Sequence, residues 1–309
     1  MALNIITLTI NPALDKSAKV DALVPTQKLK CHSIVYQPGG GGINVSRMLH
    51  RLEEKTHCLF TSGGDTGKYL QELLLKEGIN PESVAIKSWT RENLSVVDTK
   101  SNLQYRFGMP SNGLQNAELT EIKVTLDKCL KNNDILVLSG SLPEKVATDY
   151  YATLIKHVSR KNIKIVIDTS GPALTQALKE QVFLVKPNQR ELAQLAGKEF
   201  LSSTEQEAFA LEMVKSGKAH YVAVSLGARG AFMASKDGIV YQSTPSVSVK
   251  STIGAGDSMV AGLIYGIKNG FSVQDILKWG VACGVATTMN EGTNLASKSH
   301  VNNVLEMIK

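Results

Sequence analysis

Residues 251–267, STIGAGDSMVAGLIYGI, place two glycines and an aspartate directly before a long apolar pattern. Gly254 and Gly256 allow a tight turn whose backbone N–H groups are not covered by side chains. The helix predicted after this turn adds unpaired N–H donors and a partial positive charge at its start. Together these groups form a site suited to an anion such as a phosphoryl group.

Asp257 stands beside this expected anion site and has two interpretations. It can cap the helix, which aspartate does commonly, or it can serve as a base in phosphoryl transfer. A carboxylate near a helix start is expected to have a lowered pKa, which makes it a weak base at rest. It can still accept an alcohol proton as the new bond forms, as an aspartate does in protein kinases. The spacing alone leaves both interpretations open.

Other polar or glycine-rich turns follow predicted strands along the chain. Ligands of open α/β sheets bind beyond the carboxyl ends of the strands, so we expect these turns at one edge of one sheet. The turns are 11–15, 38–45, 63–67, 139–143, 186–191, 225–230 and 252–257.

Several other functions are disfavoured. The chain has no G-x-x-x-x-G-K-[ST] motif, and its glycine run 39–42 does not fit G-x-G-x-x-G, which argues against a P-loop enzyme and a dinucleotide-binding oxidoreductase. The 34 basic and 28 acidic residues give a net charge of +6, which suits anionic partners. Because the basic residues are scattered, we expect no nucleic-acid partner.

Cysteine spacing and hydropathy give an expected location. The four cysteines form no C-x-x-C pair, so we expect free thiols in a reducing cytosol. No stretch reaches the roughly eighteen apolar residues of a membrane span, and the N-terminus lacks the basic region of a signal peptide. We expect a cytoplasmic protein with no membrane partner.

The elements that must position these turns alternate between strands and helices, which predicts an α/β fold with a mostly parallel, buried sheet. Strands are predicted over 4–10, 57–62, 134–140, 164–170, 182–188 and 221–227. Helices are predicted over 43–54, 66–78, 146–160 and from Glu191. Residues 16–37 and 89–109 alternate without helix signals, which predicts antiparallel strands forming a small sheet at the edge, suited to a lid or a pairing surface.

Two motifs, PGGGGINVSR and STIGAGDSMVAG, resemble the paired signatures of the ribokinase-like (PfkB-type) carbohydrate kinases. NPALD, SGSLP and KPNQREL are similar to the sugar-phosphate kinase branch of that family. The four glycines, WTREN and QYRF are most similar to its isozyme 2 phosphofructokinases.

The resemblance implies one three-layer α/β/α domain over 1–309, with a small β lid through which two copies form a homodimer. It also implies MgATP as donor and the C1 hydroxyl of fructose 6-phosphate as acceptor. Tagatose 6-phosphate and fructose 1-phosphate are the alternative substrates. Asp257 would then be the catalytic base, and the backbone of Gly254, Ala255 and Gly256 would stabilise the transferring phosphoryl group.

The substrate residues implied by the resemblance come from several turns and the lid. Asp15 would accept hydrogen bonds from sugar hydroxyls, and the glycines would let the sugar lie against bare backbone. The guanidinium groups of Arg91 and Arg106 match the phosphate of a sugar phosphate. The full expected set is Asp15, Lys28, Gly39, Gly40, Gly41, Gly42, Asn44, Arg91, Arg106 and Ser139.

The implied nucleotide and metal residues lie further along the chain. Glu191 would help to hold Mg²⁺, which prefers oxygen ligands and keeps several waters. The nucleotide would contact Lys186, Asn188, Ser225, Gly227 and Gly230. A potassium ion is a further expectation, held by Ser251, Ile253, Asn290 and Gly292. A second class of function is a non-catalytic nucleotide-sensing protein, which the intact Asp257 and Glu191 disfavour.

Overall fold

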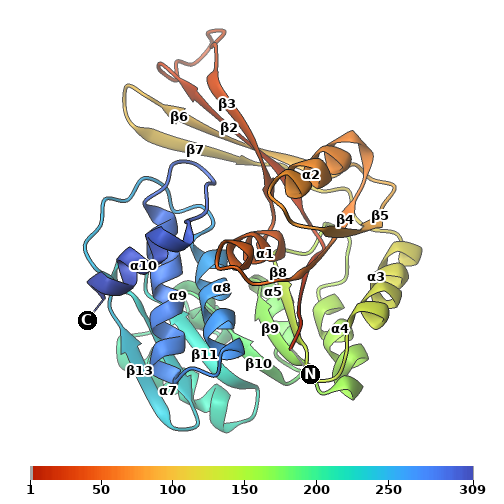
Figure 1. Ribbon diagram of the computed structural model, residues 1–309, viewed down its shortest axis with the longest axis vertical. Coiled ribbons are helices and arrows are strands. Elements are labelled where there is room, and N and C mark those ends of the chain that lie inside the picture. Colours follow the sequence, from red (N-terminus) through yellow and green to blue (C-terminus); the bar gives the residue numbers. More distant parts are fainter. Residues whose placement is uncertain (1–2, 309) are drawn as a thin grey trace.

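The computed structural model describes residues 3–308, which form a large sheet and a separate small sheet (Figure 1). The large sheet has nine strands in the order β13-β12-β11-β10-β9-β8-β1-β4-β5. Its strands are β1 (Ile5–Thr9), β4 (His57–Ser62), β5 (Pro81–Ala85), β8 (Ile135–Ser139), β9 (Lys164–Asp168), β10 (Val182–Val185), β11 (Ala219–Ser225), β12 (Ala231–Ser235) and β13 (Gly238–Gln242). Among these strands only the β11–β12 and β12–β13 pairings are antiparallel, so the prediction of a mostly parallel sheet is confirmed.

Helices cover both faces of the large sheet and give three layers. Successive side chains of β1 point to opposite faces, so Ile6 and Leu8 enter one apolar core and Ile5 enters the other. The Ile6 core is covered by α3 (Asn116–Cys129), α4 (Tyr150–Val158), α5 (Gly171–Ala177), α6 (Gln189–Leu195) and α7 (Ser203–Lys215). The Ile5 core is covered by α1 (Gly41–Arg51), α8 (Ala255–Lys268), α9 (Val273–Thr288) and α10 (Lys298–Met307).

A smaller apolar cluster attaches α2 (Gly64–Lys76) to β4 and α1. Its members are Ile43, Cys58, Phe60, Leu70, Leu74 and Ile79. Across residues 3–308, the helices are too short or too polar for any of them to cross a bilayer.

The small sheet projects beyond the strand ends of the large sheet (Figure 1). Its order is β3-β2-β6-β7, with β2 at Ala13–Val20, β3 at His32–Gly39, β6 at Arg91–Asp98 and β7 at Leu103–Gly108. The prediction that all its strands are antiparallel was wrong, because β2 and β6 pair parallel. In the chain β2 follows β1 and β6 follows β5, so both strands leave the large sheet in the same direction. Alternating side chains look the same in either orientation, so the sequence pattern does not reveal it.

The edge hairpin β12–β13 depends on a glycine at its entry. Gly230 has φ 98°, and a Cβ atom there would lie 2.0 Å from the carbonyl oxygen of Gln242. Gly238, the first residue of β13, also has a positive φ (117°), but a Cβ atom there would meet no described atom within 4 Å. Substituting each glycine by alanine therefore distinguishes the cost of a strained backbone, which both share, from the cost of steric overlap, which only Gly230 has.

We expect Gly230→Ala to destabilise the protein more than Gly238→Ala. Both variants incur a conformational cost of about 1–3 kcal/mol, and only Gly230→Ala adds an overlap that costs about 1–3 kcal/mol more. Urea unfolding of both variants measures the difference in the free energy of unfolding. Equal losses would contradict the close approach of Gly230 and Gln242.

Candidate active site

The carboxyl ends of β8 and β9 and the starts of α1, α6 and α8 surround a cavity of about 230 Å³. Among the predicted site residues, Gly41, Ser139, Glu191 and Asp257 line it. These residues are far apart in the sequence, and the parallel sheet brings them to one edge. The remaining lining residues are Gly140, Ser141, Asp168, Thr169 and Ser170.

Asp257 lies in the first turn of α8 but does not cap the helix. The N-cap residue is Gly254, with φ 74°, and no side chain caps the helix. The Oδ2 atom of Asp257 instead accepts a hydrogen bond from Nδ2 of Asn44, at 2.8 Å. The capping interpretation of Asp257 is therefore wrong. Its carboxylate faces α1 and the cavity, while the first backbone N–H groups of α8 are left without a side-chain acceptor.

The surroundings of Asp257 raise its pKa to about 6. Burial is the main cause, the negative charge of Asp168 adds to it, and the Asn44 bond and the charge of Lys186 offset it in part. The expectation of a lowered pKa was wrong, because it considered only the helix start. A carboxylate with this pKa is a better base at neutral pH than a free aspartate.

Lys186 brings a positive charge to the start of α8. Its Nζ atom lies 3.2 Å from Oδ1 of Asp168, and its side chain is buried. Burial lowers the pKa of Lys186, but the negative charges of Asp168, Glu191 and Asp257 outweigh this and raise the pKa overall. A Cβ atom on Gly256 would lie 3.6 Å from Nζ, so the ammonium stands beside the glycine turn. An anion at this turn would meet both amide hydrogens and Lys186.

Asp168 and Thr169 line the cavity and were missed by the sequence analysis. Asp168 is the last residue of β9, so the rule that selected the other turns also applied to it. Two buried hydroxyl oxygens here, Ser139 Oγ and Thr169 Oγ1, find no hydrogen-bond partner among the residues that the structure describes. Buried polar atoms normally have a partner, so both favour a polar ligand in this cavity.

Glu191 forms a capping box with the N-cap residue Asn188 at the start of α6 and also lines the cavity. Asn188 Oδ1 accepts from the backbone N–H of Glu191 at 2.9 Å, and Glu191 Oε2 accepts from the backbone N–H of Asn188 at 2.8 Å. Burial raises the pKa of Glu191, and Asp168 adds to the shift. In residues 3–308, no three His, Cys, Asp or Glu side chains form a ready metal site. Asp168 and Glu191 nevertheless bring carboxylate oxygens to this cavity, and Mg²⁺ is commonly held by one or two carboxylates together with water and phosphate.

The glycine run 39–42 is packed against the chain itself. A Cβ atom at any of its four positions would lie within 2.7 Å of another atom. Gly39 makes room for the carboxylate of Asp15, and Gly41 makes room for the hydroxyl of Ser139. The predicted reason for these glycines was access of a sugar, and the structure gives close packing as a further reason.

A second cavity of about 410 Å³ lies between the small sheet and the large domain. Asp15, Arg91, Arg106 and Ile253 of the predicted set line it. Asp15 lies within strand β2 and not in a turn, and its Oδ1 atom accepts from Nδ2 of Asn93 at 2.8 Å. Burial is the main cause of a raised pKa of Asp15.

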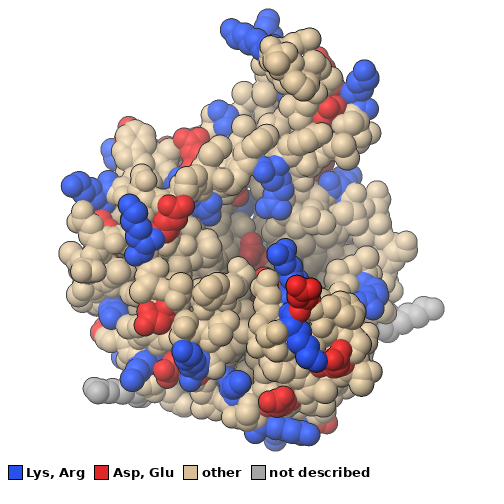
Figure 2. Space-filling model, turned by 180° about the vertical axis from the view of Figure 1, so that it is seen from behind, with Lys and Arg blue, Asp and Glu red and all other residues tan. Residues whose placement is uncertain are grey.

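Charged side chains mark the hollow beneath the small sheet (Figure 2). Acidic atoms lie inside the hollow and Lys or Arg side chains stand around it. Elsewhere on this face, basic and acidic side chains are interspersed and form no single basic patch. The cavity of about 410 Å³ falls in the size range of small-molecule sites.

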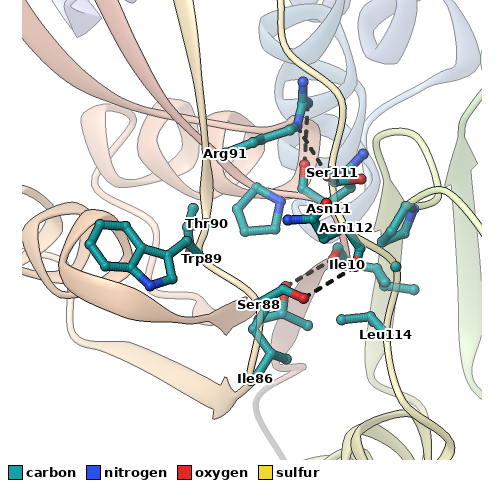
Figure 3. Close-up of a pocket in the computed structure, with 14 residues that line it drawn as sticks. Ile10, Asn11, Ile86, Ser88, Trp89, Thr90, Arg91, Ser111, Asn112 and Leu114 are labelled. Atoms are coloured by element: carbon teal, nitrogen blue, oxygen red, sulfur yellow. Dashed lines mark hydrogen bonds between the residues drawn. The ribbon is translucent and has the colours of Figure 1, made fainter.

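Arg91 and Arg106 differ in their exposure and in the hydrogen bonds that hold their side chains. The guanidinium of Arg91 points toward Asn11 (Figure 3), donating from Nε to Asn11 Oδ1 at 3.0 Å and from Nη1 to Asn93 Oδ1 at 2.9 Å. Arg106 on β7 is exposed. The pocket in Figure 3, which Arg91 helps to line, encloses only about 20 Å³. This is room for about one water molecule, so the pocket is too small for a sugar phosphate.

Apart from Ile253, the residues predicted to contact the far part of the nucleotide, Lys28 and the predicted potassium residues line neither cavity. Ser225 ends β11 and pairs with Asn188, and Gly227 and Gly230 follow that strand. Lys28 is exposed in the loop between β2 and β3 and does not line either cavity. The predicted potassium residues Ser251, Ile253, Asn290 and Gly292 fall on two neighbouring segments, since Ser251 donates its backbone N–H to the Thr288 carbonyl at 3.2 Å.

Comparison with known proteins agrees with this geometry. Residues 8–300 match the model of the pfkB family carbohydrate kinases. The chain is 39% identical over 294 residues to ATP-dependent 6-phosphofructokinase isozyme 2 of Escherichia coli, covering 95% of each chain. It is 33% identical over 286 residues to 1-phosphofructokinase of Borreliella burgdorferi, covering 92% of each.

Solved structures agree as well. Phosphofructokinase-2 from Escherichia coli in complex with potassium matches with a TM-score of 0.95 and 37% identity. The same protein in complex with fructose-6-phosphate matches with a TM-score of 0.93 and 36% identity. Each match covers 98% of both chains. With its signatures at the two cavities and this similarity over nearly its whole length, the chain belongs to the pfkB family of carbohydrate kinases.

Proposed function

We propose that this kinase transfers the γ-phosphoryl group of MgATP to the C1 hydroxyl of fructose 6-phosphate, giving fructose 1,6-bisphosphate. One observation carries the proposal: a carboxylate with a raised pKa lies beside a glycine turn and a buried lysine. The similarity to the Escherichia coli isozyme 2 enzyme supports this acceptor.

In this proposal, one set of residues accepts the hydroxyl proton and another stabilises the negative charge on the transferring phosphoryl group. Asp257 accepts the hydroxyl proton, and Asn44 holds its carboxylate through the 2.8 Å hydrogen bond. Lys186 and the first N–H groups of α8 stabilise the charge that spreads over the transferring phosphoryl oxygens. Glu191 and Asp168 would hold the hydrated Mg²⁺, which neutralises charge on the nucleotide phosphates when it is bound.

On the acceptor side, Asp15 would bind sugar hydroxyls and Arg106 the sugar phosphate. Both line the cavity beneath the small sheet. Arg91 already makes several hydrogen bonds within the chain, so it supports Asn11 and Asn93 and has fewer donors left for a phosphate. Potassium binding at Ser251, Ile253, Asn290 and Gly292 belongs to the same proposal, supported by the potassium complex of the Escherichia coli enzyme.

We expect Asp257→Asn to lower kcat by about 10²–10⁴-fold, because the amide cannot accept the proton. In the unmodified protein the carboxylate must be ionised, so kcat/KM should fall as the pH drops below about 6. Asp257→Asn should lack this fall. Steady-state kinetics between pH 5 and pH 8, with ATP binding measured as the control for folding, test both points. Near-normal turnover by Asp257→Asn would remove Asp257 as the base.

We expect kcat/KM to be highest for fructose 6-phosphate in a panel with tagatose 6-phosphate and fructose 1-phosphate. Steady-state kinetics with each sugar phosphate, with and without K⁺, measure this preference. A higher kcat/KM for either rival would replace the proposed substrate. ATP binding without turnover of any of the three would favour a nucleotide-sensing protein.

We also propose that two copies pair through the apolar face of the small sheet. Strand register places Val96 opposite Tyr105, one position from the Ser95–Arg106 pair, so Tyr105 points to the face opposite to Arg106. Ile34 on β3 and Tyr105 and Phe107 on β7 are 50%, 39% and 46% exposed, and exposed apolar surface of this kind often marks an interaction site. A second copy would cover them.

We expect the double variant Ile34→Glu/Tyr105→Glu to be monomeric, because pairing would bury unpaired carboxylates. Sedimentation velocity of the variant and the unmodified protein measures the assembly. Phe200→Glu is the matched control, since Phe200 is 75% exposed and lies outside the small sheet. A double variant that sediments like the unmodified protein would contradict pairing through this face.

A further inference from the structure

Arg47 carries a fully buried guanidinium in α1. The exposed fraction of its side chain is 0%, whereas charged groups are rarely buried without a partner. Glu77 supplies that partner, with Nη2 donating to Oε1 at 2.7 Å and Nε donating to Oε2 at 2.9 Å. Apolar side chains of similar volume often stabilise a protein as well as a buried ion pair does. The pair therefore needs a further explanation.

The third nitrogen of the guanidinium, Nη1, contacts Asn44, which in turn bonds the proposed base. Nη1 donates to the carbonyl oxygen of Pro38 at 3.0 Å and to Oδ1 of Asn44 at 3.1 Å. A guanidinium is planar, and Glu77 holds its other edge, so the direction of the Nη1 hydrogens is fixed. A lysine at this position has a single ammonium group and cannot reproduce this fork.

Arg47 and Asp257 together leave Asn44 only one orientation of its amide. Arginine is only a donor, so it requires Oδ1 of Asn44, and an ionised carboxylate is only an acceptor, so it requires Nδ2. Nδ2 donates to Oδ2 of Asp257 at 2.8 Å. A flipped amide would set oxygen against the carboxylate and nitrogen against the guanidinium. The second hydrogen of Nδ2 remains for a ligand.

We propose that Arg47 is a positioning residue for the reaction, holding the Asn44 amide so that its Nδ2 atom faces the carboxylate of Asp257. Arg47 makes no contact with Asp257 itself and acts through Asn44. The inference rests on the proposed role of Asp257 as the base.

Other charged groups also act on Asp257, and the test must separate them from Arg47. Asp168 and Asp15 raise the pKa of Asp257, whereas Lys186 and the Asn44 hydrogen bond lower it. The charge of Arg47 also acts on Asp15, where it lowers the pKa. Loss of Arg47 could therefore reach the site by two routes, and only one of them passes through Asn44.

The test is a cycle of variants in which Arg47→Met/Glu77→Gln is made with and without Asn44→Ala. Removing both charges avoids leaving an unpaired carboxylate at Glu77. With Asn44 present, we expect kcat to fall about tenfold, the effect of one lost hydrogen bond. The acid limb of kcat/KM should also move to higher pH, since the Asn44 hydrogen bond lowers the pKa of Asp257. In the Asn44→Ala background, the same change should lower kcat no further.

Two outcomes would overturn the inference: an unchanged kcat and acid limb with Asn44 present, or an equal loss of kcat in both backgrounds. Arg47→Lys keeps a positive charge beside Glu77 and serves if the double variant does not fold, and we expect it to show the same fall in kcat and the same displaced limb. Leu49→Ala, a buried change in the same helix, should lower Tm without moving the limb. If Asp257→Asn retains turnover, the proposed base itself fails, which is distinct from failure of Arg47 alone.

Discussion

The site depends on an imbalance of charge at the strand ends, where Lys186 lies among the carboxylates of Asp168, Glu191 and Asp257. One ammonium cannot neutralise three carboxylates, and burial weakens the screening by water. The excess negative charge contributes to the raised pKa of Asp257 and of Glu191. It also makes the cavity receptive to a cation, so a nucleotide would be favoured when accompanied by a divalent ion.

The glycine run 39–42 links the two cavities, because Gly39 packs against Asp15, which lines one, and Gly41 lines the other. Asn44 follows the glycine run, bonds the carboxylate of Asp257, and is fixed from behind by Arg47. Asp15 lies on β2 and packs against Gly39. Gly39 in turn precedes Asn44 by only a few residues in the chain. Tight packing at the glycine run thus sets the position of Asp257, the proposed base, relative to Asp15, which is proposed to bind the sugar. A larger residue in that run would displace both.

The sequence predicted the parallel sheet and the edge at which its turns gather, because buried strands and helix patterns are local signals. Asp168 followed the same rule and was overlooked, so a fuller use of strand ends would have found it. The predicted pKa shift of Asp257 and the predicted antiparallel pairing of β2 with β6 were wrong, because both properties depend on segments that are distant in the sequence. Periodicity describes one segment at a time, whereas desolvation and strand pairing arise from several.

Glu191 shows why helix capping and metal binding need not compete. Its capping bond to the backbone N–H of Asn188 uses Oε2. A carboxylate has about four lone-pair directions, so Oε1 and part of Oε2 can still serve a cation. The capping box fixes the side chain in advance, which removes rotamer entropy that would otherwise be lost on binding. A residue typical of an ordinary helix start is therefore also well prepared to hold a hydrated ion.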